Sequence, residues 1–456
     1  MHVTPELLAK HDKPGPRYTS YPTAIDFDAS FGATDYEARL AKAAESSEPL
    51  SLYVHLPFCQ ARCLYCACHV VISPHGKGVD PYMEALRREI ELVSSRLGGK
   101  RRVTQLHLGG GTPTYHDPDA LRALLGWLRA GFALDEGAEV AVELDPRVTT
   151  PAHLEALAAE GFNRVSLGVQ DFDPKVQEAI GRVQSVEQTR ALIAQARALG
   201  ISSVNLDLIY GLPHQTPESF RETLAQVVEL GPDRLAIYAF AWVPWLKGHQ
   251  KKMPQEALPD AKARLALLAV ASEVLTAAGY VHIGMDHFAK PDDELCRARA
   301  EGRLSRNFMG YTTSRAPDMI GLGLSSIGFV GGAYVQNEKQ LAAYERAIEA
   351  GRLPVERGRA LSDEDHLRAY VIRELMCNLV VHKGEVRRRF GVDFDAHFGD
   401  LDGALGKLAD DGLIREDGEA LRVEPLGQLF VRSVAMLFDA YTQQRRQDRP
   451  TFSRTV

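Results

Sequence analysis

Four of the six cysteines in this chain of 456 residues fall within the run HLPFCQARCLYCACHV, as Cys59, Cys63, Cys66 and Cys68. Six cysteines are too few for a disulfide scaffold of this length, so a tight group of them predicts a metal or redox site. Cys59, Cys63 and Cys66 would offer three thiolates from one loop. Electron-transfer clusters take four cysteines, whereas an iron–sulfur cluster with three protein ligands would leave one iron open to a small molecule.

Three other interpretations of these cysteines remain open. Cys63 and Cys66 have the spacing of a thioredoxin-type redox pair, but such a pair opens a helix in a small domain and leaves Cys59 unexplained. All four could bind structural zinc, although Cys66 and Cys68 are awkwardly close for two ligands of one tetrahedral ion. They could also be buried free thiols. Cys296 and Cys377 stand alone, and we expect them to be ordinary core or surface residues.

The elements that must position the cysteines are short β-rich runs that begin near residues 51, 105, 139, 164, 203 and 234. Helical segments separate these runs, and an Asp-Pro or Thr-Pro pair predicts the start of four helices, with caps at Asp80, Asp117, Thr150 and Thr216. Ser185 and Gln188 predict a capping box. The alternation predicts a parallel sheet of right-handed βαβ units. No Gly-x-Gly-x-x-Gly follows the first strand, which disfavours a dinucleotide-binding fold and favours a full or partial barrel.

In barrels the chemistry lies where strands end. The unusual residues of this chain fall at such positions, which supports the barrel interpretation. They are His55 and the cysteines after the first strand, Gly109, Gly110 and Gly111 after the second, Glu143 after the third, Gln170 after the fourth and Asp207 after the fifth.

Two regions flank a predicted barrel at residues 49–340. Residues 1–48 form an N-terminal extension, which starts with the run PGPRYTSYPT and continues as a helix. Residues 341–456 predict a mainly helical C-terminal domain, in which residues 401–424 have the helix, turn and hairpin pattern of a winged helix. That span holds seven acidic and three basic residues, which would repel phosphates, so we expect a packing or lid module instead of a DNA-binding one.

Composition narrows the class of protein further. The chain is 45% hydrophobic and 25% charged, as in globular proteins, and its net charge of −7 gives no reason to expect nucleic-acid or membrane-surface partners. The longest uncharged stretch, 319–337, contains five glycines and predicts no transmembrane helix. The first residues lack the apolar core of a signal peptide, so we expect a cytoplasmic protein.

Motifs along essentially the whole chain resemble one known family. Cys59-x3-Cys63-x2-Cys66, followed by the run Gly109-Gly110-Gly111-Thr112-Pro113, resembles the radical S-adenosylmethionine (SAM) superfamily. Within it, the chain resembles the oxygen-independent coproporphyrinogen III oxidases through RYTSYPT, YVHLPFC, LHLGGGTPT, DLIYGLP, IGMDHFAKPDDEL, NFMGYTT and FSRTV. The haem chaperones of the superfamily typically lack RYTSYPT and carry an aromatic residue in place of Cys68, so both features favour the oxidases.

The resemblance implies a partial (β/α)6-type radical SAM barrel and a role for each matched residue. Cys59, Cys63 and Cys66 would ligate the 4Fe–4S cluster, and Cys68 would not. The candidate catalytic residues are Tyr53, His55 and Glu143. The residues implied to contact the cofactor are Tyr53, Gly110, Gly111, Thr112, Glu143 and Ile327, and those implied to line a second SAM site are Tyr65, Gln170, Arg182, Asp207 and Ala241. Alternatives remain for three positions: an inward core residue for His55, a helix cap for Glu143, and a structural ion pair between Arg182 and Asp207.

The resemblance also implies a reaction and its partners. A 5′-deoxyadenosyl radical from SAM would take hydrogen from the β-carbon of each of two propionates of coproporphyrinogen III. Each substrate radical would then lose one electron and carbon dioxide to become a vinyl group of protoporphyrinogen IX, so two SAM molecules would be consumed per product. The propionates need cations, for which Arg17 is the first candidate. The second is the basic tail of Arg445, Arg446, Arg449 and Arg454, for which a solvated helix end is the alternative.

Two further expectations concern partners. We expect an electron donor such as flavodoxin or ferredoxin, and a monomeric protein. The alternative functions are a haem-binding or haem-delivery protein on the same scaffold and a radical SAM enzyme with another substrate, because a fold alone does not determine function.

Overall fold

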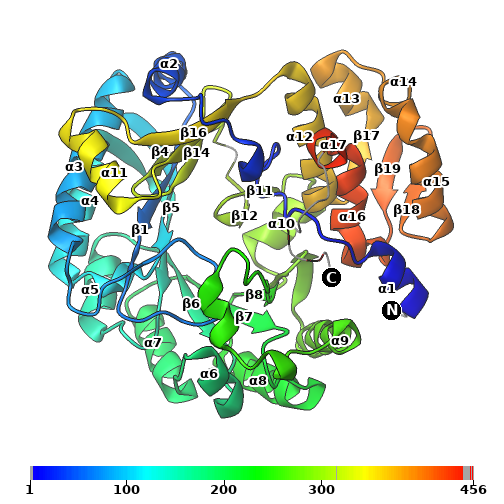
Figure 1. Cartoon of the computed structure of the whole chain (residues 1–456), viewed down its shortest axis with the longest axis horizontal. Helices are drawn as coiled ribbons and strands as arrows, with labels where there is room; N and C mark the ends of the chain where they lie inside the picture. The colour runs from blue at the N-terminus through cyan, green and yellow to red at the C-terminus, as the bar shows by residue number, and fades with distance from the viewer. Residues whose placement is uncertain (1–3, 315, 445–451, 453, 455–456) are drawn as a thin grey trace.

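One large sheet organises the barrel half of the chain (Figure 1). The computed structural model describes residues 4–314, 316–444, 452 and 454. Six of its strands occur where the β-rich runs predict them: β1 (Leu50–Leu56), β4 (Arg101–Gly110), β5 (Phe132–Leu144), β6 (Arg164–Gln170), β7 (Ser203–Tyr210) and β8 (Arg234–Ala239). They pair in this order and all in parallel, so their carboxyl ends meet at one edge of the sheet.

The barrel is partial, because the sheet does not close. A seventh parallel strand, β13 (Asp318–Leu322), pairs with β1 and was not predicted from the sequence. Beyond it lie three antiparallel strands, β14 (Ile327–Val330), β15 (Ala333–Asn337) and β16 (Val355–Ala360). The other edge carries β10 (His287–Ala289) and β9 (Val281–Gly284). The α/β fold class and partial barrel predicted from the sequence are confirmed.

Helices cover the outer face of the sheet, on the left and lower sides of Figure 1. They are α3 (Val79–Arg96), α4 (Pro118–Gly131), α5 (Pro151–Ala159), α6 (Pro174–Ile180), α7 (Val186–Ala198), α8 (Pro217–Leu230) and α9 (Ala261–Ala277). Asp117, Thr150 and Thr216 are N-caps, and Ser185 forms its capping box with Gln188, as predicted. Asp80 is not a cap, because Gly78, with φ of 86°, turns the chain first and Asp80 lies in the first turn of α3.

The C-terminal region is mainly helical, as predicted. Its helices are α12 (Asp363–Asn378), α13 (Lys383–Phe390), α14 (Phe394–Phe398), α15 (Asp402–Asp410), α16 (Val431–Ala435) and α17 (Ala440–Gln444). A small sheet of β17 (Val380–His382), β19 (Ala420–Val423) and β18 (Ile414–Glu416) packs beside them, so the predicted helix, turn and hairpin pattern is present.

The two larger of the three hydrophobic cores in the described residues do not divide the chain at residue 340. The barrel core includes Tyr344 and Ile348 of α11 (Leu341–Glu349), and β16 completes the sheet edge. The second core unites the C-terminal helices with Ile283 and with Tyr311 of the hairpin β11 (Ser305–Asn307) and β12 (Gly310–Thr312). The domain limits therefore stay a prediction, and packing groups residues on each side of them differently.

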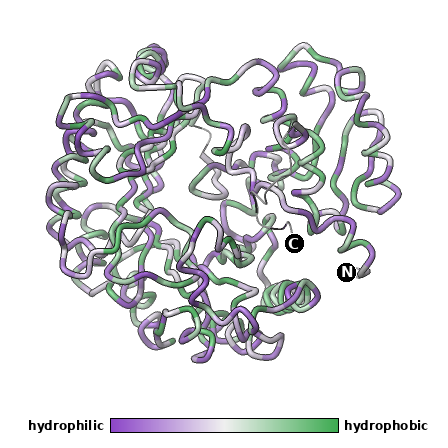
Figure 2. The backbone as a smooth tube through the Cα atoms, viewed as in Figure 1, coloured by the Kyte–Doolittle hydropathy of each residue, from purple (hydrophilic) through white to green (hydrophobic). Residues whose placement is uncertain are grey.

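The N-terminal extension spans both bodies. Its helix α1 (Pro5–His11) meets the C-terminal body, where Lys10 and His11 both pair with Asp411, and its helix α2 (Ala33–Ala44) packs on the barrel core. Figure 2 shows hydrophobic stretches dispersed along the chain, with α9 among the most hydrophobic helices. Within the described residues, no helix combines the length and apolar character needed to cross a bilayer.

Candidate active site

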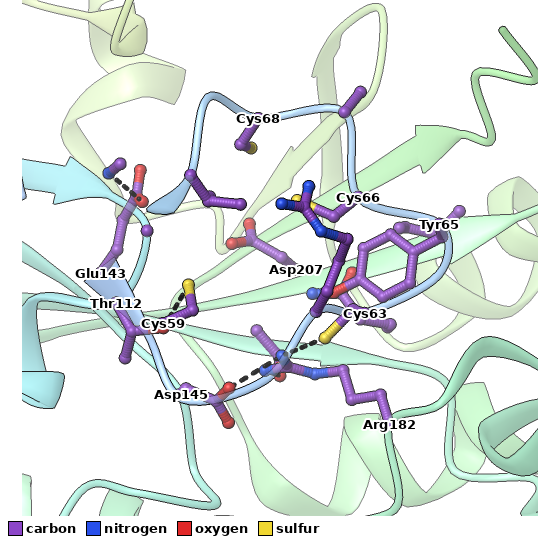
Figure 3. A pocket seen from close by; sticks show the side chains of 18 of the residues that line it. Cys59, Cys63, Tyr65, Cys66, Cys68, Thr112, Glu143, Asp145, Arg182 and Asp207 are labelled. Atoms are coloured by element: carbon purple, nitrogen blue, oxygen red, sulfur yellow. Dashed lines mark hydrogen bonds and ion pairs between the residues drawn. The ribbon is translucent and has the colours of Figure 1, made fainter. Parts of the chain in front are cut away.

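A cavity of about 570 Å³ opens at the carboxyl ends of the parallel strands. Its lining unites most of the residues that the sequence singled out (Figure 3). These are Cys59, Cys63, Tyr65, Cys66, Gly110, Gly111, Thr112, Glu143, Gln170, Arg182, Asp207 and Ala241. Gln170 has a φ of 70°, an uncommon backbone conformation for a residue with a side chain, at the point where β6 turns into the rim.

The loop that carries the cysteines is held from three sides. Its first residues form the short strand β2 (Phe58–Cys59), which pairs with β3 (Val71–Ile72). The Leu64 amide donates to the carbonyl of Ile180, 2.9 Å away, at the end of α6. After β8, Gln250 donates to the Tyr65 carbonyl at 3.1 Å and His249 Nε2 to the Cys66 carbonyl at 2.8 Å. The thiols therefore lie on a loop whose backbone is anchored to β3, to the end of α6 and to the turn that follows β8.

The thiols differ in electrostatic environment. Burial raises the pKa of the Cys59 thiol to about 11, although Thr112 Oγ1 lies 3.5 Å from its sulfur and opposes that shift. A hydrogen bond from the Cys68 thiol, with the charges of Lys247 and Arg62, lowers the pKa of Cys66 to about 6 against the effect of burial. Metal-binding cysteines must be thiolates, so the environment of Cys66 favours the ligand form.

Two guanidinium groups point at the third thiol. Arg147 Nη2 lies 3.4 Å and Arg182 Nη1 lies 3.5 Å from the Cys63 sulfur. Asp145 holds both arginines, with contacts of 2.7 Å to Arg147 and 2.9 Å to Arg182. Burial raises the pKa of Asp145, but the two guanidiniums outweigh it and lower the pKa below its ordinary value. A negatively charged metal–thiolate group at Cys63 would find compensating positive charge here.

Sequence reasoning missed Asp145 and Arg147. It considered Asp207 as the partner of Arg182, but Asp145 is the partner in the structure. A signal was present, since Asp145-Pro146-Arg147 follows directly after the third predicted strand, where a barrel places functional side chains.

The three consecutive glycines end β4 against other parts of the site. A Cβ atom on Gly109 would lie 2.9 Å from Glu143 Oε1, one on Gly110 2.7 Å from His55 Cε1, and one on Gly111 2.5 Å from the Pro57 carbonyl oxygen. At Gly111 the neighbour is backbone, so glycine is required there for the chain past β4 to approach it closely, whereas the other two positions face side chains. The Gly110 amide, with a φ of 118°, donates to Glu143 at 3.2 Å.

Two carboxylates face the cavity with opposite tendencies. Burial raises the pKa of Glu143, but His107 Nε2, at 3.2 Å, and the Gly110 amide outweigh it and lower the pKa. Burial and the negative charge of Glu143 raise the pKa of Asp207 to about 6, although the Ser166 hydroxyl and Asn205 amide both donate to it. Near neutral pH, Glu143 is therefore ionised, whereas the pKa of Asp207 is close enough to neutrality for this carboxyl to exchange a proton.

Tyr53 and His55 form a second layer beneath the lining. His55 Nε2 lies 2.9 Å from the His69 carbonyl, which only accepts, so Nε2 carries the proton. Nδ1 then accepts a hydrogen bond from the Tyr53 hydroxyl, 2.9 Å away. Burial lowers the pKa of His55 to about 4, which keeps the ring neutral. His55 contacts the cysteine loop and Gly110, Tyr53 contacts His55, and neither residue is among those that line the cavity.

Other predicted residues lie elsewhere. Ile327 begins β14, away from the cavity lining, and its backbone packs on Gly321. Arg17 pairs with Asp286, and its guanidinium lies 5.6 Å from the ring centroid of Tyr238, whose side chain lines the cavity. Arg445, Arg446 and Arg449 fall outside the described residues, and Arg454 pairs with Asp12 at 2.6 Å.

The donor set fits an iron–sulfur cluster with three protein ligands. In the described residues there is no group of three or more Cys, His, Asp or Glu side chains that could hold a single metal ion. A single tetrahedral ion needs all its donors about 2 Å from one point, whereas a cluster places its cysteines on separate irons. Three thiols on one anchored loop, open cavity and two guanidinium groups meet the second requirement.

Comparisons with known proteins agree with this site. Residues 53–227 match the model of the Radical SAM superfamily, and residues 361–430 match that of the HemN C-terminal domain. Oxygen-independent coproporphyrinogen III oxidase from Synechocystis is 42% identical over 99% of this chain and 97% of its own. That of Pseudomonas aeruginosa is 43% identical, over 99% and 98%.

A solved structure extends the match to the fold. Coproporphyrinogen III oxidase from Escherichia coli, described as a radical SAM enzyme, superposes with a TM-score of 0.90 at 42% identity, over 93% of this chain and 97% of that one. Fold, cysteine loop and superfamily model together define a radical SAM protein. The chain belongs to the family of oxygen-independent coproporphyrinogen III oxidases.

Proposed function

We propose that this protein converts coproporphyrinogen III to protoporphyrinogen IX without oxygen, by oxidative decarboxylation of two propionates to vinyl groups. The observation that carries the proposal is the convergence of Cys59, Cys63 and Cys66 with the glycine run and Glu143 on one cavity, in a chain similar to the named oxidases over nearly its full length. The names of the relatives do not say where in this molecule the reaction would occur, and the cavity by itself does not suggest the substrate.

Cys59, Cys63 and Cys66 would hold a 4Fe–4S cluster. When bound, the cluster and SAM supply one electron and a 5′-deoxyadenosyl radical able to abstract hydrogen. The protein's own contribution is position and electrostatics. Asp145 fixes Arg147 and Arg182 beside Cys63, where their positive charges offset the negative charge of the thiolates.

Glu143 and the glycine run form the next part of the proposal. A firmly ionised Glu143 near the cysteines is suited to bind the ammonium group of SAM. Its carboxylate is already oriented by His107 and the Gly110 amide, so little freedom is lost when a ligand arrives. Tyr53 and the neutral His55 hold the strand ends in place from below.

We also propose two SAM molecules. Tyr65, Gln170, Arg182, Asp207 and Ala241 all line the same cavity as the first set of residues, which supports a second binding position beside the first. The expected binding stoichiometry is two per cluster-loaded chain, measured by equilibrium dialysis under anaerobic conditions. Replacing Ala241 by Trp should reduce it to one, and one SAM in the unmodified protein would refute this part.

We further propose the oligomeric state, compartment and reductant of the protein, and a role for Arg17. The protein would act as a monomer in the cytoplasm, where reducing conditions keep its thiol loop from oxidising. Its reductant would be a flavodoxin or ferredoxin. Arg17 would help to bind the substrate propionates from the side of Tyr238.

Product analysis tests the central proposal. Anaerobically reconstituted protein with SAM and a reductant should convert coproporphyrinogen III to protoporphyrinogen IX, with release of carbon dioxide, methionine and 5′-deoxyadenosine. Deuterium at the propionate β-carbons should appear in the 5′-deoxyadenosine. Cleavage of SAM without deuterium transfer or vinyl product would refute the oxidase function, and tight haem binding by the same protein would then favour haem delivery.

A further inference from the structure

Two of the exposed large hydrophobic side chains lie next to the cysteine loop. Trp245 is 48% exposed and Leu246 is 66% exposed, on the segment that follows β8. That segment touches the loop directly, because Lys247 donates to the Cys68 carbonyl at 3.0 Å and His249 to the Cys66 carbonyl at 2.8 Å. In Figure 1 it lies in green beside the blue loop that follows β1. An exposed tryptophan next to an exposed leucine suggests a contact surface.

Exposed basic side chains occur on the same segment as this apolar pair and on the loop that the segment contacts. Lys251 and Lys252 are exposed in the turn that follows, and Arg62 is exposed on the cysteine loop itself. We call Arg62, Trp245, Leu246, Lys251 and Lys252 the basic apolar patch. The wider sequence supports its sign: no Asp or Glu occurs between Glu48 and Asp80, or between Asp233 and Glu256, in a chain with 60 acidic residues and a net charge of −7.

The segment that carries most of the patch also contacts the cysteine loop. Lys247 and His249 of this segment each donate one hydrogen bond, to the carbonyls of Cys68 and Cys66 respectively. Gln250, buried in the same turn, binds the Tyr65 carbonyl and the Ala241 carbonyl, so the turn is locked to both the loop and the end of β8. A carrier bound on the patch would stand close to the cysteine loop, which matters because electron transfer slows steeply with distance.

We propose that the basic apolar patch docks a small acidic protein that carries one low-potential electron. This inference rests on the proposed function, which needs an electron for each SAM cleaved. In each docking event the carrier is oxidised by one electron and the cluster at Cys59, Cys63 and Cys66 is reduced by one. Lysines around an apolar centre steer an acidic partner and speed encounter, while Trp245 and Leu246 provide the buried contact of a small transient interface.

Charge reversal tests the proposal. The variant Lys251→Glu/Lys252→Glu and the variant Trp245→Ser/Leu246→Ser are compared with unmodified protein in SAM cleavage, driven either by a reduced acidic flavodoxin or by dithionite. At low ionic strength the flavodoxin-driven rate of the first variant should fall by about tenfold or more, because steering of this kind raises association rates by 10 to 10³. The dithionite-driven rate should stay within about twofold, since a small ion needs no docking surface.

Matched controls show whether position matters. Arg387→Glu/Arg388→Glu reverses two exposed charges on α13, in the C-terminal body, and Leu199→Ser removes an exposed apolar side chain at the end of α7. Both should leave the flavodoxin-driven rate unchanged. An equal loss in the α13 variant, or an unchanged rate in the lysine variant, would overturn the proposal.

A binding measurement separates this proposal from the proposed function. Oxidised flavodoxin should bind the unmodified protein in titration calorimetry, more weakly as salt rises, and should lose that affinity in the lysine variant. If unmodified protein cleaves no SAM with dithionite, the proposed function fails, and flavodoxin affinity alone then decides whether the patch is a docking surface. Absence of binding to the unmodified protein at low salt would refute it.

Discussion

Two guanidinium groups lie beside Cys63, one of the three predicted cluster ligands. Arg147 and Arg182 both reach its sulfur, and Asp145 fixes them there. Hydrogen bonds to sulfur and nearby charge are among the factors that determine the reduction potential of iron–sulfur clusters. At this scale we therefore expect residues outside the cysteine motif to influence the reduction potential of the cluster.

The variant Arg147→Met should lower the reduction potential of the cluster. It removes one N–H donor and one positive charge beside Cys63, both of which stabilise the more negative reduced state. An anaerobic redox titration followed by electron paramagnetic resonance measures the shift. Arg122→Met, on the exposed face of α4, is the control and should leave the potential unchanged. A potential that stays the same or rises in Arg147→Met would contradict the assignment.

Cys66 and Cys68 should respond differently to substitution. Cys66→Ser should remove the cluster, because only two thiolates of the predicted set remain, whereas Cys68→Ala should keep about four irons per chain. Iron analysis and absorbance after anaerobic reconstitution distinguish the two. Full iron and activity in Cys66→Ser would show that the ligand assignment is wrong, and total loss in Cys68→Ala would show that four cysteines ligate.

Asp207 should make stability depend on pH. Burial and Glu143 raise its pKa to about 6, so the folded protein holds this proton more tightly than the unfolded chain, in which aspartates titrate near pH 4. Its contribution to the free energy of unfolding therefore decreases as pH rises from about 4 to about 6 and stays low above that range.

Asp207→Asn mimics the protonated form and should avoid that penalty. We expect the variant to be more stable than the unmodified protein at pH 8, by up to about 3 kcal/mol, and equal to it near pH 4. Thermal unfolding at the two pH values measures the difference. A variant less stable at pH 8, or one with the same difference at both values, would be at odds with a raised pKa.

At the scale of elements, the site depends on how closely β4 approaches β1 and the loop after it. The amide of Gly111 donates to the Leu56 carbonyl at 2.8 Å, and that of Thr112 to the Phe58 carbonyl at 3.0 Å. This pairing continues past the end of the strands and leaves no room for a Cβ atom at Gly111. The glycine run is therefore a packing requirement between two elements before it is a contact for any ligand.

Gly111→Ala should destabilise the protein and displace the cysteine loop. The new Cβ would lie 2.5 Å from the Pro57 carbonyl oxygen, a backbone atom that cannot move alone. Overpacking of this kind costs about 1–3 kcal/mol, and we expect reduced cluster loading with it.

Gly126→Ala is the matched control, in the exposed middle of α4 with no atom within 4 Å of the new Cβ. It should stabilise by about 0.5–1 kcal/mol, because alanine favours a helix. Thermal unfolding and iron analysis report both variants. Full stability and iron content in Gly111→Ala would refute the packing argument.

At the scale of the whole molecule, the N-terminal extension links the barrel to the C-terminal body. The Tyr18 hydroxyl donates to Asp439 at 2.9 Å, while Asp28 pairs with Gly358 of β16 through backbone hydrogen bonds. Directly before the first of these anchors, Arg17 pairs with Asp286 and lies beside Tyr238 at the edge of the cavity. The extension, which links the two bodies, thus places one cation, Arg17, beside the site.

Arg17→Ala should weaken turnover of coproporphyrinogen III far more than cleavage of SAM without substrate. Loss of a charged hydrogen bond to a propionate corresponds to about a tenfold decrease or more in turnover. The two rates are measured on the same anaerobic preparation, and Arg17→Lys, which keeps the charge without the planar fork, should fall between. Equal losses in both rates would place Arg17 in folding through Asp286 instead of in substrate binding.

Local chemistry made much of the barrel predictable. Strands of alternating pattern, prolines behind Asp or Thr caps, and one dense cysteine loop depend on near neighbours, so they can be read from the chain itself. Parallel strands must bring their carboxyl ends to one edge, so the cysteines, Glu143, Gln170 and Asp207 were predictable as neighbours, whereas the resemblance supplied Tyr65, Arg182 and Ala241. The resemblance in motifs added a family, which the comparisons confirmed.

Tertiary structure alone decided the long-range partners. The strand β13, which begins at residue 318, pairs with β1, and Asp145 rather than Asp207 forms the ion pair with Arg182. Arg17 pairs with Asp286, which lies far along the chain. No local preference encodes such pairs, since each depends on which surfaces meet when two cores and a spanning extension pack together. The sequence by itself therefore determined the types of residues at the site, and packing determined which of them touch.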